Sequence, residues 1–174
     1  MLLKTEKYLE ILYDEYADLL YRIALTHSQN QHDAMDAVQD VFVKVASLDK
    51  SFSDKEHQKA WLIRLVINRC HDLSRKLRVR HYTPLDEVYD FPDEDSRLSP
   101  NVKEMLDALP EKFKTVLVLH YLEGFSVEEI SAILNISISA VKMRLSRARD
   151  FVKDKHEREE FYDKSDRYKQ ISPD

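Results

Sequence analysis

Glycine and cysteine are the scarcest residues of this chain, with one of each among 174 residues. Tight hairpin turns depend on glycine or Asn-Gly pairs, so the near absence of glycine argues against a β-sheet protein. The abundant Leu, Val, Ile, Glu, Lys and Arg favour helices instead. A single cysteine excludes a disulfide framework and a cysteine zinc site within one chain, and the apolar neighbours of Cys70 predict a buried, unreactive thiol. The composition therefore predicts an all-α protein.

Long apolar runs are also missing. No stretch reaches the ~18 residues of a membrane span, and the opening MLLKTEKYLEILYDEY carries charges where a signal peptide needs an apolar core. We therefore expect a soluble, cytoplasmic protein without direct membrane insertion. The seven histidines show no H-E-x-x-H spacing, and the chain contains no glycine-rich phosphate loop. We expect no catalytic residue, no metal site and no cofactor.

The charges are unevenly distributed along the chain. A net charge of -5 would by itself discourage nucleic-acid binding. However, residues 60–82 carry six Lys and Arg against Asp72 alone, and residues 83–100 carry six carboxylates against Arg97 alone. A basic block followed directly by an acidic block predicts separate electrostatic roles for the two segments.

Apolar residues at helical spacing predict three helices in the first half of the chain. They cover about residues 8–25, a segment that begins near Asp33, and about residues 58–80, with a polar loop before the third. These helices would form an N-terminal domain over residues 1–82. Its expected core residues are Leu9, Leu12, Tyr13, Tyr16, Leu19, Leu20 and Ile23; Ala34, Ala37, Val38, Val41, Phe42 and Val45; and Ile63, Val66, Ile67, Cys70, Leu73 and Leu77.

Proline and charge divide the second half of the chain. Pro84, Pro92 and Pro100 each disfavour helix at the preceding residue, so residues 83–100 form an acidic linker. A second helical domain is predicted over residues 101–155, followed by a charged tail over residues 156–174 that we expect to be frayed or disordered. The helices expected in the second domain cover residues 101–109, 110–122, 126–134 and 137–155.

The stretch EGFSVEEISAILNISISAVKMRLSRAR has the pattern of a helix-turn-helix. Ser126 and Glu129 form a capping box, Asn135 tolerates left-handed geometry at the turn, and Ser137 caps the second helix. Small residues near the start of that helix and long cations beyond them are typical of a DNA recognition helix. A helical hairpin with a solvated cationic face is the alternative. With Val141, Leu145 and Ala148 facing inward, the residues left to face outward are Ser139, Ala140, Lys142, Met143, Arg144, Ser146, Arg147 and Arg149.

These motifs resemble one family along most of residues 8–155. LPEKFKTVLVLHYLEGFSVEEISAILNISISAVKMRLSRAR resembles the -35-binding σ4 domain of bacterial σ factors of the extracytoplasmic-function group in the σ70 family. LYDEYADLLYRIA, DAMDAVQDVFVKV and AWLIRLVINRCHDLSRKLRVR resemble the σ2 domain of the same group. The resemblance implies a non-enzymatic factor that binds core RNA polymerase, directs it to -35 and -10 promoter elements and assists promoter opening.

The resemblance also implies partners and site residues. The expected partners are the β′ coiled coil and the β flap of the polymerase, promoter DNA and an anti-σ factor. The polymerase set is Asp36, Gln39, Asp40 and Phe42; the -10 set is Trp61, Arg64, Asn68, Arg75 and Lys76; and the -35 set is Ser139, Ala140, Lys142, Met143, Arg144, Ser146 and Arg147.

Several roles stay open within this resemblance. Phe42 and Trp61 are also explained as core residues, and the acidic linker either mimics nucleic acid in the polymerase channels or is a solvated spacer. The loop SFSDKEHQK would hold an extruded base. Family members often have Gly-Thr in place of Ser139 and Ala140, and a small polar residue in place of Met143, so the exact -35 sequence does not carry over.

Two other classes of protein remain as alternatives. A stand-alone helix-turn-helix regulator would explain residues 126–149 but leaves the N-terminal half unassigned. A helical adaptor that binds only proteins would leave the clustered arginines unexplained.

Overall fold

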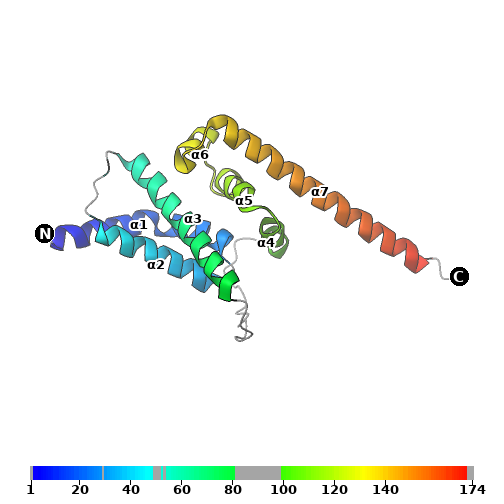
Figure 1. The fold of residues 1–174 in the computed structure, drawn as a ribbon, viewed down its shortest axis with the longest axis horizontal. Coiled ribbons are helices and arrows are strands. Elements are labelled where there is room, and N and C mark those ends of the chain that lie inside the picture. Colours follow the sequence, from blue (N-terminus) through cyan, green and yellow to red (C-terminus); the bar gives the residue numbers. More distant parts are fainter. Residues whose placement is uncertain (1, 29, 49–51, 53, 81–98, 172–174) are drawn as a thin grey trace. The chain divides into compact units, whose positions relative to one another are not determined.

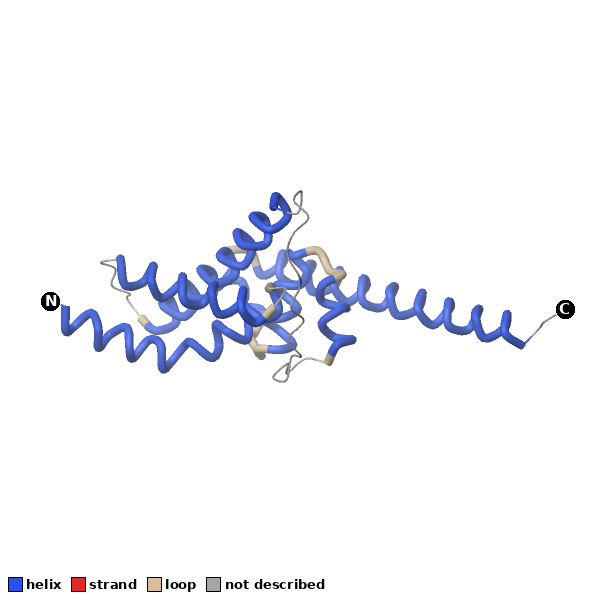
Figure 2. The backbone as a smooth tube through the Cα atoms, turned by 90° about the horizontal axis from the view of Figure 1, so that it is seen from below, coloured by secondary structure: helices blue, strands red, loops and turns tan. Residues whose placement is uncertain are grey.

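The computed structural model describes residues 2–28, 30–48, 52, 54–80 and 99–171 (Figure 1). Over these ranges every regular element is helical and no strand occurs (Figure 2), which confirms the prediction of an all-α protein. Two compact units are formed, one that contains α1 to α3 and one that contains α4, α5, η1, the first part of α6 and α7. Their elements are α1 (Leu2–His27), α2 (Gln31–Ser47), α3 (Lys55–Arg80), α4 (Pro100–Asp107), α5 (Glu111–Leu117), the π-helix η1 (Val118–Leu122), α6 (Val127–Leu134) and α7 (Ile138–Ile171).

The first unit is a three-helix core. The residues predicted for its interior are mostly buried, with Leu20, Ile23 and Val66 fully inaccessible to solvent. Cys70 is buried as predicted, and its Sγ accepts a hydrogen bond from Ser28 Oγ at 3.6 Å. Tyr13 is a wrong prediction, because 55% of it is exposed. It lies at the edge of the apolar stripe, where its ring packs on Phe42 of α2 with the ring centroids 5.1 Å apart.

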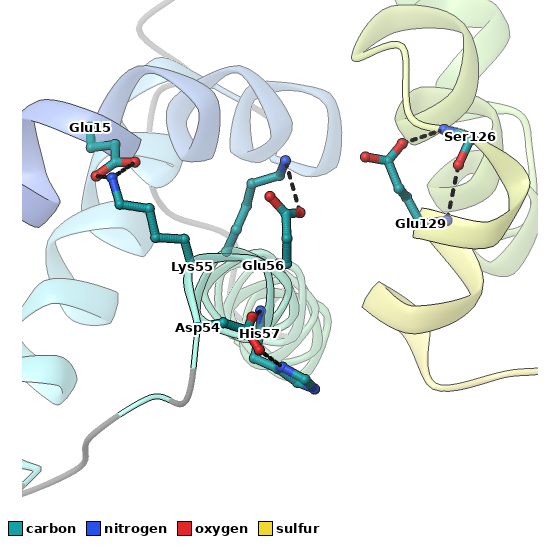
Figure 3. A network of polar contacts seen from close by, with 8 residues as sticks. Glu15, Asp54, Lys55, Glu56, His57, Ser126 and Glu129 are labelled. Carbon is teal, nitrogen blue, oxygen red and sulfur yellow. Dashed lines mark hydrogen bonds and ion pairs between the residues drawn. The ribbon is translucent and has the colours of Figure 1, made fainter.

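The start of α3 is fixed by polar contacts (Figure 3). Asp54 caps the helix, since the His57 amide donates to Asp54 Oδ1 at 2.8 Å and His57 Nδ1 lies 2.6 Å from Asp54 Oδ2. Lys55 Nζ donates to both carboxylate oxygens of Glu15 on α1, at 3.0 and 3.2 Å, and this contact lowers the pKa of the Glu15 carboxyl. These contacts explain why α3 begins three residues before the predicted position at Gln58.

The second unit packs around Leu106, Val116, Leu119, Ile130 and Val141, each no more than 1% exposed. The helix expected over residues 110–122 is divided into α5 and η1. The division follows from a wider turn, in which the Glu123 amide donates to the Val118 carbonyl at 3.0 Å, an i→i+5 bond.

The acidic linker and the tail have different outcomes. Residues 81–98, most of the predicted linker, lie outside the described residues. The expectation of a frayed or disordered tail is wrong for residues 156–171, because α7 continues without a break to Ile171, and residues 172–174 lie outside the described residues. Residues 156–171 contain no glycine or proline and are rich in Glu, Lys and Arg, which have high helix propensity.

Candidate polymerase and DNA interfaces

The helix-turn-helix has the local geometry that its sequence predicts. In the capping box, the Ser126 amide donates to Glu129 Oε2 at 2.8 Å and the Glu129 amide donates to Ser126 Oγ at 3.1 Å (Figure 3). Asn135 adopts the left-handed conformation, with φ of 53°. The Ala140 amide donates to Ser137 Oγ at 3.1 Å, which caps α7. The turn between α6 and α7 is therefore set by its own side chains.

The predicted -35 residues share one side of the first turns of α7. The inward positions Val141, Leu145 and Ala148 are buried, with at most 4% exposed. Of the predicted set, Ala140 and Arg144 are half-buried and the other members are exposed. The exposed members are Ser139, Lys142, Met143, Ser146 and Arg147. The structure therefore presents two exposed cations and one half-buried cation beside two hydroxyls and a thioether on one helix face.

Arg149 is also exposed, but it is engaged. Its Nη1 donates to the hydroxyl of Tyr121 at 3.2 Å, so its guanidinium is tied to the segment before α6. Helical spacing predicts that this arginine faces outward. It does not predict the contact with Tyr121, which lies 28 positions earlier in the sequence.

The predicted -10 residues lie along the outer side of α3. Asn68, Arg75 and Lys76 are exposed and Arg64 is half-buried. Their spacing places Arg64, Asn68 and Arg75 on one helix face. Arg75 Nη2 donates to Asp72 Oδ1 at 2.7 Å, within the same helix. The structure thus gathers an amide and several cations into one polar stripe.

Of the two interpretations of Trp61, the structure argues against a core residue, and its role as a -10 contact stays a prediction. It is half-buried rather than core, and its ring packs on Phe52 with centroids 5.1 Å apart and a tilt of 52°. Residues 49–51 and 53, part of the loop expected to hold a base, lie outside the described residues.

The predicted polymerase residues project from α2. Gln39 is exposed, and the Asp36 side chain is 48% exposed with Oδ1 3.8 Å from His32 Nδ1. Phe42 is half-buried and packs on Tyr13 of α1, with ring centroids 5.1 Å apart. Two apolar residues missed by the sequence analysis are exposed on the same helix, Met35 at 51% and Val43 at 68%. Their exposure could have been predicted, because both residues lie outside the buried stripe of apolar residues on α2.

Asp40 differs from its neighbours because it forms an ion pair across two helices. Arg69 of α3 donates from Nε to Asp40 Oδ2 at 2.6 Å, and its Nη2 contacts the same oxygen. The two side chains remain 30% exposed for Arg69 and 44% for Asp40. The predicted polymerase set therefore contains one carboxylate with a cationic partner on the helix assigned to the -10 element.

Comparison with known proteins agrees with this geometry. Residues 12–80 match the family described as Sigma-70 region 2, and residues 100–152 match Sigma-70, region 4. The extracytoplasmic-function (ECF) factor SigE of Mycolicibacterium smegmatis is 34% identical over 150 residues, which are 80% of this chain and 58% of that protein. SigV of Bacillus subtilis, an RNA polymerase sigma factor, is 32% identical over 131 residues, which are 74% of this chain and 78% of that protein.

Solved structures show the same fold. The sigma factor RpoE in complex with the anti-sigma factor NepR, from Bartonella quintana, gives a TM-score of 0.66 at 24% identity, covering 85% of this chain and 96% of that one. CnrH in complex with the cytosolic domain of CnrY gives a TM-score of 0.65 at 26% identity, covering 87% and 89%.

The matched regions and their order define a transcription initiation factor with a region 2 domain and a region 4 domain. The chain belongs to the ECF group of the σ70 family, whose members are not enzymes. A stand-alone regulator or an adaptor would leave one matched region without a role and is not favoured. Among the described residues, no helix is both long and apolar enough to cross a membrane.

Proposed function

We propose that this protein binds core RNA polymerase and directs it to promoters with -35 and -10 elements, where it assists DNA opening in the cytoplasm. The observation that carries the proposal is the presence of regions 2 and 4 in one chain, each with an accessible surface of suitable chemistry.

The proposed polymerase surface lies on α2. Exposed Met35 and Val43 and half-buried Phe42 supply apolar area, and Asp36 and Gln39 supply acidic and polar groups beside it. An apolar centre with a polar, acidic rim suits a helix that combines apolar and basic residues. We assign the β′ coiled coil as this partner, and the β flap as a partner of the second unit.

The proposed DNA surfaces lie on α3 and α7. The outward stripe of α3, with Asn68 between Arg64 and Arg75, combines a base-reading amide with cations for the phosphates of the -10 element. The start of α7 would enter the major groove of the -35 element, with Ser139, Met143 and Ser146 setting sequence preference. Trp61 would contribute by packing on Phe52, which belongs to the loop before α3.

An anti-σ factor is a further proposed partner. The RpoE structure contains a sigma factor in complex with the anti-sigma factor NepR, and the CnrH structure contains CnrH in complex with the cytosolic domain of CnrY. We propose that an anti-σ factor binds this chain as well and holds it inactive.

Run-off transcription with purified core polymerase and a pool of promoter fragments tests the function. Specific transcripts that appear only when this protein is added would support it, and they would reveal the shared promoter sequences. If the protein neither co-elutes with polymerase nor supports transcripts, yet retains DNA fragments, the stand-alone regulator is the better interpretation.

A charge insertion tests the polymerase surface itself. Gln39→Arg places a cation in the centre of the exposed α2 face and should abolish co-elution with core polymerase. The matched control is Ile11→Arg, since Ile11 is 53% exposed and lies two residues before Tyr13, on the other side of α1. If both variants co-elute as the unmodified protein does, α2 is not the docking surface.

A further inference from the structure

The pairing of Arg69 with Asp40 joins the two proposed surfaces of the first unit. Arg69 follows Asn68 directly in α3 and is one of the six cations of the basic block over residues 60–82. In the structure, however, its guanidinium is turned to α2 and contacts Asp40 through Nε, at 2.6 Å, and through Nη2. Arg69 therefore has a specific protein partner 29 positions away.

The geometry of this pair is one-sided. Both Arg69 nitrogens contact Oδ2 of Asp40, which leaves Oδ1 for a second donor. A two-oxygen fork would have occupied the whole carboxylate. Since the Asp40 side chain is 44% exposed, its free oxygen is accessible to an incoming partner.

A role in stability alone is a weak explanation for the pair. Ion pairs that remain open to solvent contribute little to folding, because water screens the attraction and two side chains lose freedom. What such a pair does provide is direction: the short Asp40 side chain is held in one rotamer by a cation from the neighbouring helix. Asp36 lies one helical turn before Asp40 on the same face of α2, so the oriented carboxylate lies beside a second residue of the predicted polymerase set.

We propose that Arg69 is a positioning residue of the polymerase surface, which orients Asp40 so that its Oδ1 accepts a hydrogen bond from a basic side chain of the polymerase. This inference rests on the proposed function of α2 as the docking helix. It assigns one arginine of the basic α3 segment to protein binding rather than to DNA.

A double-mutant cycle on polymerase affinity tests the proposal. The dissociation constant for core polymerase is measured for the unmodified chain, Asp40→Ala, Arg69→Ala and the double variant. Each single substitution should weaken binding about tenfold. The double variant should be no weaker than Asp40→Ala, because Arg69 acts through that carboxylate. Arg69→Lys should restore part of the loss, since the ammonium keeps the charge but lacks the guanidinium geometry.

The control variant is Arg22→Ala. Arg22 is also a part-buried arginine in an ion pair, but it contacts Asp18 of its own helix, α1, and it belongs to none of the proposed binding sets. Its removal should leave polymerase affinity within about twofold of the unmodified chain. Affinity for a single-stranded -10 oligonucleotide and the thermal midpoint are measured on all variants. Arg69→Ala should leave both nearly unchanged.

Different failures have different meanings. If Arg69→Ala weakens oligonucleotide binding but not polymerase binding, Arg69 is a DNA contact and the proposal is wrong. If the two single losses multiply in the double variant, or if the loss follows the thermal midpoint without rescue by Arg69→Lys, Arg69 does not act through Asp40. If Gln39→Arg abolishes polymerase binding while Arg69→Ala has no effect, only the positioning role fails. If neither has an effect, the proposed docking helix fails as well.

Discussion

At the scale of single residues, contacts with other side chains of the fold distinguish arginines that look equivalent in the sequence. Arg147 is exposed on α7, Arg149 is tied to Tyr121, and Arg69 is tied to Asp40. Counting cations along the chain therefore overstates the number that are available to DNA.

Arg147→Ala should weaken binding of the polymerase complex to its own -35 sequence by about 1–3 kcal/mol, because an exposed arginine of a recognition helix reads a guanine edge. The measurement is promoter affinity on matched and mismatched -35 sequences. The control is Arg149→Ala, which should cost less, since that guanidinium already donates to Tyr121. An equal loss on every sequence, with a flatter salt dependence, would show that Arg147 contacts only phosphate.

Tyr16 should make folding sensitive to alkaline pH. Burial raises the pKa of its hydroxyl to about 12, with the charge of Glu15 adding to the shift. In the unfolded chain the Tyr16 hydroxyl ionises near pH 10. The neutral phenol therefore favours the folded state fully below that pH. About 2–3 kcal/mol of the free energy of unfolding is lost as the pH rises from about 10 to 12. Chemical unfolding of the unmodified chain and of Tyr16→Phe should show a smaller loss in the variant. If the free energy of unfolding falls equally with pH in both chains over this range, the prediction is contradicted.

At the scale of elements, the sequence predicts what is determined locally. The capping box of Ser126 and Glu129, the left-handed turn at Asn135 and the cap at Ser137 each depend on residues within one turn of helix, and all are confirmed. The buried stripes were also mostly predicted, because helical spacing fixes which residues share a face.

The features that the sequence did not reveal depend on a second element. Tyr13 lies at the margin of its stripe, and only the position of α2 decides that its ring packs on Phe42 while the rest stays exposed. Arg69 and Asp40 meet because α2 and α3 are neighbours, which no spacing within either helix indicates. One missed feature is local instead: the division of one expected helix into α5 and η1 follows from a backbone hydrogen bond between Glu123 and Val118, five residues apart, which the spacing of apolar residues does not predict.

Gly124→Ala should isolate the backbone cost of the turn before α6. Gly124 has a φ of 75°, and a Cβ at this position would meet no atom within 4 Å. The loss therefore comes from left-handed geometry alone and should be about 1 kcal/mol in the free energy of unfolding. Gly124→Asn should cost less, because Asn tolerates this region better. Denaturant unfolding of both variants checks the order, and a neutral alanine variant would contradict it.

At the scale of the whole molecule, the charges are segregated, which would allow an acidic protein to bind DNA. The net charge of -5 coexists with a cationic start of α7 and a basic α3. The six carboxylates of residues 83–100 account for much of the excess negative charge and are separate in sequence from both proposed DNA-binding sets. Two roles for them, mimicry of nucleic acid and simple solvation, predict different behaviour.

Replacing these six carboxylates with amides tests the mimicry of nucleic acid. We expect several-fold weaker binding to core polymerase, because the cationic channels lose an anionic ligand, and we expect the difference to shrink as salt screens the attraction. The substitutions are Asp86→Asn, Glu87→Gln, Asp90→Asn, Asp93→Asn, Glu94→Gln and Asp95→Asn. A variant with the same linker residues in shuffled order keeps the charge and serves as the control. Unchanged affinity of the neutral variant would identify the segment as a solvated spacer.

The length of α7 offers a practical consequence. One uninterrupted helix of 34 residues carries the proposed -35 face in its first turns and reaches Ile171, a length of about 50 Å (Figure 1). A fluorophore attached near Ile171 would move with the proposed -35 face at the start of α7, yet it would lie about 50 Å along the helix from that face. Energy transfer from that dye to one on a promoter fragment would report the tilt of the helix in the groove without altering a single contact residue.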